Sequence, residues 1–263
     1  MIQKTICIHS DTPKPHEIPV IITCPEEEPK AILIMCHGTG TDKNEAGNGY
    51  VKAAEILADT YHVITMRFDF MGSGDSEADY ADYCFDSAMD DVMSVLAFAR
   101  REISASLPAG LLGWSQGGTD VLLSLGYHPE AFAFGITWAG APDLSSMMND
   151  EQYREAMENG YFTMEFDWRS DLHAGRQWAE DVRHKDVLQI FSRYTGPVLA
   201  IAGEDDDVVP PVWAEKIIQN NSHPASRALF IPGADHTYRV FEEADQRTLV
   251  SVIEASGQFI AAL

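Results

Sequence analysis

The sequence lacks the features of membrane-spanning and secreted chains. No stretch approaches the roughly 18 uncharged apolar residues that a transmembrane helix needs. The start, MIQKTICIHS, has no basic segment followed by an apolar one, as a secretory signal would. None of the four cysteines forms a CxxC pair, so neither a zinc knuckle nor a thioredoxin-like motif is supported. We therefore expect a protein without a membrane span, in a reducing, cytoplasmic setting.

Basic residues are also scarce. The chain has 18 Lys and Arg against 41 Asp and Glu, which gives a net charge of −23. Such a surface repels phosphate backbones and anionic lipid, so we expect no nucleic-acid partner and no docking on membranes. Acidity alone would favour an interaction module, but solubility explains it equally well. The sequence carries no signal for an oligomeric state.

What is present is an alternation of strand and helix. The 263 residues are 45% hydrophobic and 22% charged, which is typical of one globular α/β domain. Apolar runs such as AILIMC and PVLAIA indicate strands buried on both faces of a mostly parallel sheet. The first two strands have no helix between them and should pair antiparallel at an edge. Cys7 and Cys36 lie in apolar runs and are expected to be buried. The predicted strands cover residues 2–8, 18–24, 31–37, 62–68, 110–114, 133–138, 198–202 and 227–231, and the predicted helices 50–57, 85–101, 117–125, 212–219 and 241–263.

Residues 142–190 interrupt this alternation. They contain many aromatic and acidic residues, show no convincing strand, and separate the strand ending TWAG from the strand PVLAIA. An excursion from the carboxyl edge of such a sheet lies where ligand crevices form. We expect a helical cap here, inserted into a single domain that spans residues 1–263.

The most informative motif is Gly-Trp-Ser-Gln-Gly at residues 113–117. It follows the apolar strand AGLLG and opens a helical pattern, the context that a G-x-S-x-G nucleophile requires. The glycines allow a tight turn that exposes the hydroxyl of Ser115, and the helix amino terminus favours developing negative charge. An ordinary glycine turn is the alternative, and the flanking strand and helix make it the weaker interpretation.

A serine nucleophile needs a base, and the base needs a carboxylate. His236 follows the last predicted strand, in the segment GADHTY, where it could reach the serine. Four consecutive acids at 204–207 follow the predicted strand 198–202. The chain order is then serine, acid, histidine, which is the order found with G-x-S-x-G nucleophiles. Asp143, after the strand TWAG, is a rival position. The residues alone leave the choice of acid open.

These motifs together resemble those of the α/β-hydrolases, and more narrowly those of capped bacterial serine esterases, which include feruloyl and cinnamoyl esterases. The similarity rests on CHGTGTDKNE, RFDFMGSGDS, GWSQGG, GEDDDVVP and GADHTY, which occur in the family's order. It implies an eight-stranded, mostly parallel sheet with helices on both faces and a helical cap after the sixth strand. It also implies that Ser115, Asp206 and His236 are the catalytic residues, because the family's acid stands two residues before the first valine of a VVP-like ending.

The resemblance further implies an oxyanion hole made by the backbone N–H groups of Thr39 and Gln116. The family usually has a bulky residue where this chain has Thr39, so the resemblance does not fix the shape of the acyl pocket. His37 matches a residue that shapes the loop, and Gly72, Gly74 and Ser76 match a structural loop. Trp114 and the cap aromatics Phe162, Phe166 and Trp168 are candidate substrate contacts, although cap aromatics can equally fill the cap's own core.

The expected activity is hydrolysis of small-molecule carboxylic esters through an acyl-enzyme, with aromatic (hydroxycinnamoyl-type) or short acyl groups as candidate substrates. This chemistry needs no metal and no organic cofactor. The alternatives are another hydrolase of the same fold, namely a peptidase, thioesterase or lactone hydrolase, and a ligand-binding protein without catalysis.

Overall fold

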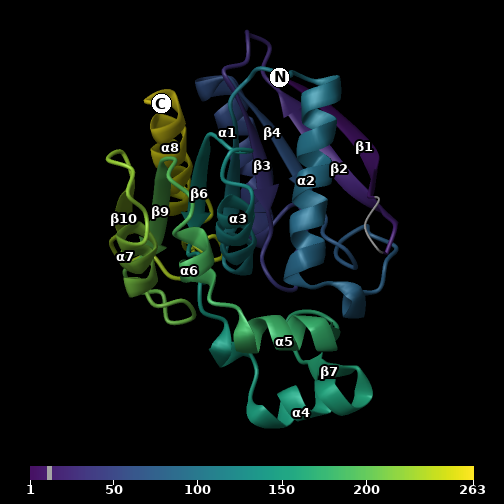
Figure 1. Ribbon diagram of the computed structural model, residues 1–263. Coiled ribbons are helices and arrows are strands. Elements are labelled where there is room, and N and C mark those ends of the chain that lie inside the picture. The colour runs from purple at the N-terminus through teal and green to yellow at the C-terminus, as the bar shows by residue number, and fades with distance from the viewer. Residues whose placement is uncertain (11–13) are drawn as a thin grey trace.

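A central sheet organises the chain in the computed structural model, which describes residues 1–10 and 14–263 (Figure 1). Among these residues the sheet has eight strands, in the order β1-β2-β4-β3-β5-β6-β9-β10. β1 pairs antiparallel with β2 at one edge, as predicted, β2 pairs antiparallel with β4, and the remaining pairs are parallel. The strands are β1 (Ile2–Ser10), β2 (His16–Cys24), β3 (Ala31–Cys36), β4 (Val63–Phe68), β5 (Ala109–Trp114), β6 (Phe134–Trp138), β9 (Val198–Gly203) and β10 (Arg227–Ile231).

Helices cover both faces of this sheet, and each face has its own core. One core lies under α2 (Phe85–Glu102), α3 (Gln116–Tyr127), α6 (Val187–Phe191) and α7 (Val212–Gln219), and the other under α1 (Gly49–Tyr61) and α8 (Arg247–Ala261) (Figure 1). The apolar run of β3 explains the arrangement, because alternate strand residues point to opposite faces. Ile32, Ile34 and Cys36 pack in the first core, and Ala31, Leu33 and Met35 in the second. The predicted α/β layers are therefore confirmed.

Two local expectations are wrong. Cys7 is exposed, because β1 is an edge strand with most of its side chains facing solvent. The last helix begins at Arg247 and not at 241. Tyr238, Arg239 and Gln246 have a positive φ, and Glu243 accepts hydrogen bonds from the backbone N–H and the hydroxyl of Thr248, so the chain turns before the helix starts.

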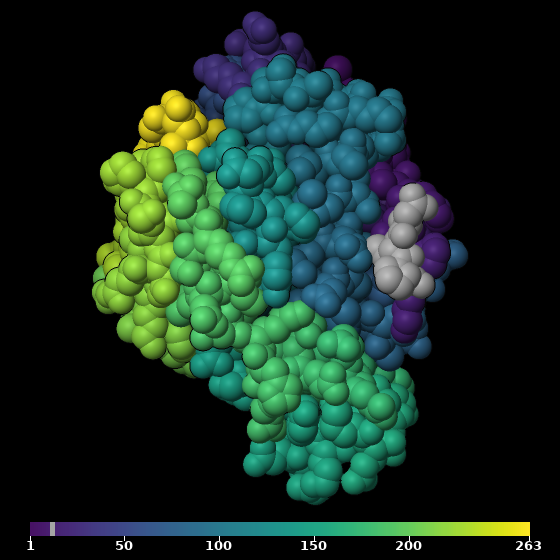
Figure 2. All heavy atoms as spheres, in the orientation of Figure 1, coloured from purple at the N-terminus to yellow at the C-terminus, as the bar shows by residue number. Residues whose placement is uncertain are grey.

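The segment 142–190 follows β6 and lies at the carboxyl edge of the sheet (Figure 1). Figure 2 shows it as a lobe at one end of the molecule. The sequence predicts a purely helical cap, and this prediction is wrong, because β7 and β8 pair antiparallel within the segment. Aromatic and β-branched residues with alternating burial favour a strand at β7. The elements here are the 3-10 turn η3 (Ser145–Met147), α4 (Asp150–Asn159), β7 (Tyr161–Met164), β8 (Leu172–Gly175) and α5 (Arg176–His184), followed by α6.

Across the described ranges 1–10 and 14–263, no helix is both long enough and apolar enough to cross a membrane.

Candidate active site

Ser115 occupies a sharp turn between β5 and α3. Its backbone, at φ 55° and ψ −122°, has a conformation that few residues other than glycine adopt. The turn is packed so tightly that a Cβ on Gly117 would lie 2.1 Å from the carbonyl oxygen of Cys36, and one on Gly113 would lie 2.1 Å from that of Gly117. Glycine is therefore required at both positions, which gives the predicted role of the flanking glycines a steric basis.

The hydroxyl of Ser115 faces His236. The distance between Ser115 Oγ and His236 Nε2 is 3.1 Å, and His236 Nδ1 lies 2.9 Å from Asp206 Oδ2. The Asp206 side chain is fully buried and the imidazole is mostly buried. The structure thus brings together the three side chains that the resemblance implies as catalytic. Hydroxyl, imidazole and carboxylate lie in the sequence of contacts that acyl transfer requires.

The acidic loop after β9 separates its four carboxylates by environment. Asp206 is buried, and its Oδ1 accepts hydrogen bonds from the N–H groups of Val208 and Val209 at 2.9 and 2.8 Å. Glu204, Asp205 and Asp207 are exposed. The rival Asp143 is also exposed, and it accepts a bond from its neighbour Ser145.

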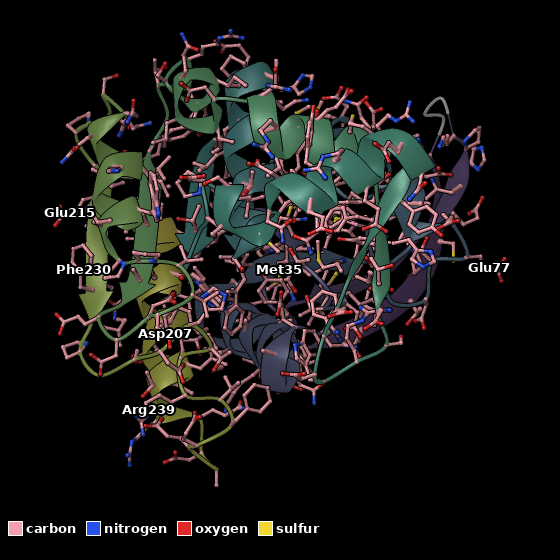
Figure 3. The ribbon with its side chains drawn as sticks, turned by 90° about the horizontal axis from the view of Figure 1, so that it is seen from below. Met35, Glu77, Asp207, Glu215, Phe230 and Arg239 are labelled. Atoms are coloured by element: carbon pink, nitrogen blue, oxygen red, sulfur yellow. The ribbon has the colours of Figure 1, made fainter. Side chains whose placement is uncertain are left out.

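The loop that carries His236 is attached to the acidic loop and to the core. The N–H of Asp205 donates to the carbonyl of Ala234, and the view onto the carboxyl edge shows Asp207 and Arg239 on the same side of the molecule (Figure 3).

The indole N–H of Trp114 donates to the carbonyl of His236 at 3.0 Å. Trp114 is otherwise buried in the α1–α8 core, against Trp138 among others. The expectation that Trp114 contacts substrate is therefore wrong, because its strand position points it into the core.

Thr39, the predicted second oxyanion donor, lies on the loop after β3. Across the described ranges, neither the N–H of Thr39 nor that of Gln116 donates to a protein acceptor. The neighbouring N–H of Gly38 is already bonded to the half-buried carboxylate of Glu45, whose pKa is raised by desolvation. His37 Nδ1 lies 2.9 Å from the carbonyl of Gly38, and its Nε2 accepts from the N–H of Phe70. His37 shapes the loop, as predicted.

The hydroxyl group of Thr39 explains why a threonine occupies this position. Its hydroxyl donates to the side-chain Oε1 of Gln116 at 2.8 Å. The two residues whose backbone N–H groups form the candidate oxyanion hole are thus joined by their side chains. A bulky apolar residue at position 39 could not make this bond.

The cap aromatics divide into two groups. Phe162 is fully buried and packs against Trp178, so it belongs to the cap's own core and the expectation of substrate contact is wrong for it. Phe166 and Trp168 lie against the loop after β3 that carries Thr39 and Gly40: a Cβ on Gly40 would be 3.1 Å from one ring and 3.2 Å from the other. Arg169 also donates to the carbonyl of Gly40 at 2.6 Å. This part of the cap adjoins the site.

Sequence reasoning missed three side chains that contact Gln116 directly or through one neighbour, namely Tyr83, Asp120 and Trp178. Gln116 Nε2 donates to the hydroxyl of Tyr83, which donates to Asp120 Oδ2, and the Trp178 indole donates to Gln116 Oε1. One signal was available for Asp120. It is the single acid in the apolar helix GGTDVLLSLG, four residues after Gln116 and so on the same helix face.

Metal binding has no evident site in the described part of the chain, where no three His, Cys, Asp or Glu side chains are grouped suitably for an ion.

Comparison with known proteins identifies relatives of this fold. The sequence matches the prolyl oligopeptidase family over residues 53–252. The structure is similar to Est1E from Butyrivibrio proteoclasticus with ferulic acid bound (TM-score 0.78, 21% identity, 97% of each chain covered). It also resembles a putative hydrolase from Agrobacterium vitis S4 (TM-score 0.77, 20% identity, 99% of this chain and 100% of the other). A third similar structure is the esterase domain of a Rhodothermus marinus protein (TM-score 0.73, 19% identity, 100% of this chain and 99% of the other). No curated protein sequence matches the chain.

Proposed function

The chain belongs to the prolyl oligopeptidase family and has the α/β-hydrolase fold, and from this premise we propose that it is a serine hydrolase of small-molecule carboxylic esters. The observation that carries the proposal is the contact series from Ser115 Oγ to His236 Nε2 at 3.1 Å and from His236 Nδ1 to Asp206 Oδ2 at 2.9 Å.

The reaction proceeds in two halves. His236 removes the hydroxyl proton as Ser115 Oγ attacks the ester carbonyl carbon, and the carbonyl oxygen becomes an oxyanion. When the tetrahedral intermediate collapses, the carbon–oxygen bond to the leaving group breaks, and His236 protonates the departing alcohol. Water, deprotonated by the same imidazole, then attacks the acyl carbon. The bond from that carbon to Ser115 Oγ breaks, the imidazolium returns its proton to Oγ, and the acid is released.

The surrounding groups lower the barrier in two ways. Asp206 holds the imidazole in the tautomer that accepts at Nε2, and it stabilises the imidazolium that forms. The N–H groups of Thr39 and Gln116 donate to the oxyanion, and the loss of one such donor costs roughly 3–4 kcal/mol in the transition state. The bonds within the protein already hold Asp206 and the Thr39 loop in place, so little reorganisation accompanies the reaction.

The acyl group is expected to be aromatic or short. Phe166 and Trp168 lie against Gly40, next to Thr39, and so flank the candidate oxyanion hole. Aromatic side chains favour a planar acyl group and exclude water. The fold similarity to Est1E, solved with ferulic acid bound, is in keeping with this substrate class.

Hydrolysis of peptide bonds is the second candidate. It is favoured by the family match over residues 53–252, since the family is named for an oligopeptidase. The same nucleophile and base can cleave an amide, provided that His236 protonates the departing amine.

A substrate panel tests the proposal. We expect purified protein to hydrolyse esters of aromatic and short aliphatic acids faster than prolyl peptide amides, and a fluorophosphonate to label Ser115. The Ser115→Ala variant should retain the fold but lose at least about 10³-fold in kcat and all of the label. Faster cleavage of the amides would favour the peptidase, and turnover by Ser115→Ala near the parent rate would contradict the serine mechanism.

A further inference from the structure

A continuous series of buried hydrogen bonds runs from the first core to the candidate oxyanion hole. From it we infer that Asp120 and Tyr83 are positioning residues, which act through the side-chain amide of Gln116 on the two oxyanion donors. Trp178 of the cap fixes the direction of that amide. The inference rests on the proposed function, because it concerns the oxyanion of the same reaction.

The direction of each bond follows from the chemistry of its two ends. An indole N–H can only donate, so the Gln116 atom that faces Trp178 Nε1 at 3.3 Å must be the amide oxygen. The amide nitrogen therefore points the other way, to the hydroxyl oxygen of Tyr83 at 2.8 Å. Because that oxygen accepts, the hydroxyl hydrogen is free for the carboxyl of Asp120, 3.0 Å away. The cap and the core thus hold one amide orientation from opposite sides.

This orientation is the one that reaches the oxyanion loop. Thr39 Oγ1 donates to the same Oε1 atom, at 2.8 Å. A reversed amide would present an N–H₂ group to Thr39 and to the donor-only Trp178, and the second of these pairings cannot form a hydrogen bond. The direction set by Asp120 and Trp178 therefore keeps residue 39 joined to residue 116.

The join matters because the two oxyanion donors come from different elements. Gln116 is the first residue of α3, whereas Thr39 is on the loop after β3. Oxyanion stabilisation needs both N–H groups about 2.7–3.1 Å from the developing charge. The Thr39–Gln116 bond fixes their separation before substrate binds. Its loss lets the loop move and weakens a contact made mainly in the transition state.

Asp120 has no evident structural reason to be acidic. It is fully buried on α3, its Oδ1 has no hydrogen-bond partner among the described residues, and burial raises its pKa well above the usual range. A buried carboxyl with a single hydrogen bond costs stability. Its side-chain hydrogen-bond partner among the described residues, Tyr83, contacts Gln116 directly, so a place in the site accounts for an otherwise unfavourable residue.

Steady-state kinetics on the best ester test the inference. Asp120→Leu and Tyr83→Phe each remove one bond of the series, and we expect both to lower kcat at least tenfold while KM stays within twofold. Asp120→Asn keeps an oxygen that accepts from Tyr83 and should recover most of the lost kcat. Trp178→Phe removes the donor-only end and should also lower kcat. Ser124→Ala is the matched control, because Ser124 is buried one turn further along α3 and its hydroxyl has no hydrogen-bond partner within residues 1–10 and 14–263.

A second readout separates positioning from general damage to the fold. A trifluoromethyl ketone adds to Ser115 and forms a stable oxyanion in the same hole, so its Ki should rise in each variant by the factor that kcat/KM falls. The unfolding temperature should not follow that factor. If Tyr83→Phe and Asp120→Leu turn over at the parent rate, or if Asp120→Asn is as impaired as Asp120→Leu, the inference is wrong. A parent protein inactive on every ester and amide overturns the proposed function as well.

Discussion

At the scale of single residues, environment separates groups of the same chemistry. Asp205, Asp206 and Asp207 are consecutive aspartates, but only Asp206 is buried against His236 and accepts two backbone N–H groups. The loop lies next to His236 because both follow the carboxyl ends of neighbouring strands, β9 and β10, as the order of the motifs predicted. The residues themselves could not select among the acids; the resemblance to the esterases did so by position.

Single replacements in this loop test the assignment. Asp206→Asn should lower kcat/KM by about 10³- to 10⁴-fold, because an amide cannot hold the imidazole in the required tautomer or offset its charge. Asp205→Asn and Asp207→Asn are matched controls and should stay within about threefold of the parent. A large loss in either control, or a nearly silent Asp206→Asn, would show that the acid has been assigned wrongly. Asp143→Asn then becomes the variant to measure.

The pKa of Asp120 predicts a pH-dependent stability. Burial raises this pKa, and the charges of Asp91 and Asp181 raise it further. The folded protein therefore binds a proton more tightly than the unfolded chain, and folding stability falls as pH rises from the ordinary carboxyl pKa, about 3.9, through the raised folded value. Asp120→Asn removes this dependence.

Urea unfolding at pH 5, 6.5 and 8 measures the effect. The free energy of unfolding of Asp120→Asn, minus that of the parent, should increase with pH. For Ser124→Ala, which carries no titratable group, the corresponding difference should stay constant. A difference for Asp120→Asn that is flat, or that decreases with pH, contradicts the raised pKa.

At the scale of elements, the strands of the sheet were predictable and the cap was not. Long apolar runs such as that of β3 mark strands buried on both faces, and all eight lie close to their predicted positions. β7 and β8 are only four residues each and lie in polar sequence, so their alternation is too short to recognise. The sequence also could not show that Phe162 points into the cap while Phe166 lies against the loop that carries Thr39 and Gly40. Which way a cap aromatic faces depends on tertiary packing.

The position of the cap predicts its effect on selectivity. Phe166→Ala and Trp168→Ala should each change the ratio of rates on aromatic and aliphatic esters by about tenfold, because each removes a ring that lies against Gly40. Tyr161→Ala is the control, since this exposed ring stacks on His173 in the cap hairpin. Rate ratios measured on the ester panel give the answer. Equal ratios in all three variants would mean that the cap is structural only.

At the scale of the whole molecule, the charge is strongly unbalanced. A net charge of −23 leaves many carboxylates with no basic partner. Mutual repulsion of these groups destabilises the compact state, and salt screens it. The sequence predicts this property directly, because it depends on composition rather than on packing.

Salt should therefore stabilise the protein. We expect the unfolding temperature at pH 7.5 to rise by several degrees as NaCl increases from about 20 mM to about 500 mM, a range over which the Debye length falls from roughly 20 to 4 Å. The gain should shrink at pH 5, where protonation lowers the net charge. Calorimetry in matched buffers measures both. An unfolding temperature that falls with salt at pH 7.5 would show that attractive ion pairs outweigh the repulsion.

The insertion point of the cap has an evolutionary consequence. β6 and β9 are hydrogen-bonded neighbours in the sheet, from Gly135 beside Val198 to Trp138 beside Ile201, so the whole cap leaves and returns between two adjacent strands. The entropy of closing such a loop changes slowly with its length. A descendant can therefore lengthen, shorten or exchange this segment without disturbing the sheet. The turn at Ser115 has no such freedom, since a single methyl group on Gly113 or Gly117 would collide with the backbone. New substrates are thus expected to arise in this lineage by changes in the cap, while the turn at Ser115 stays the same.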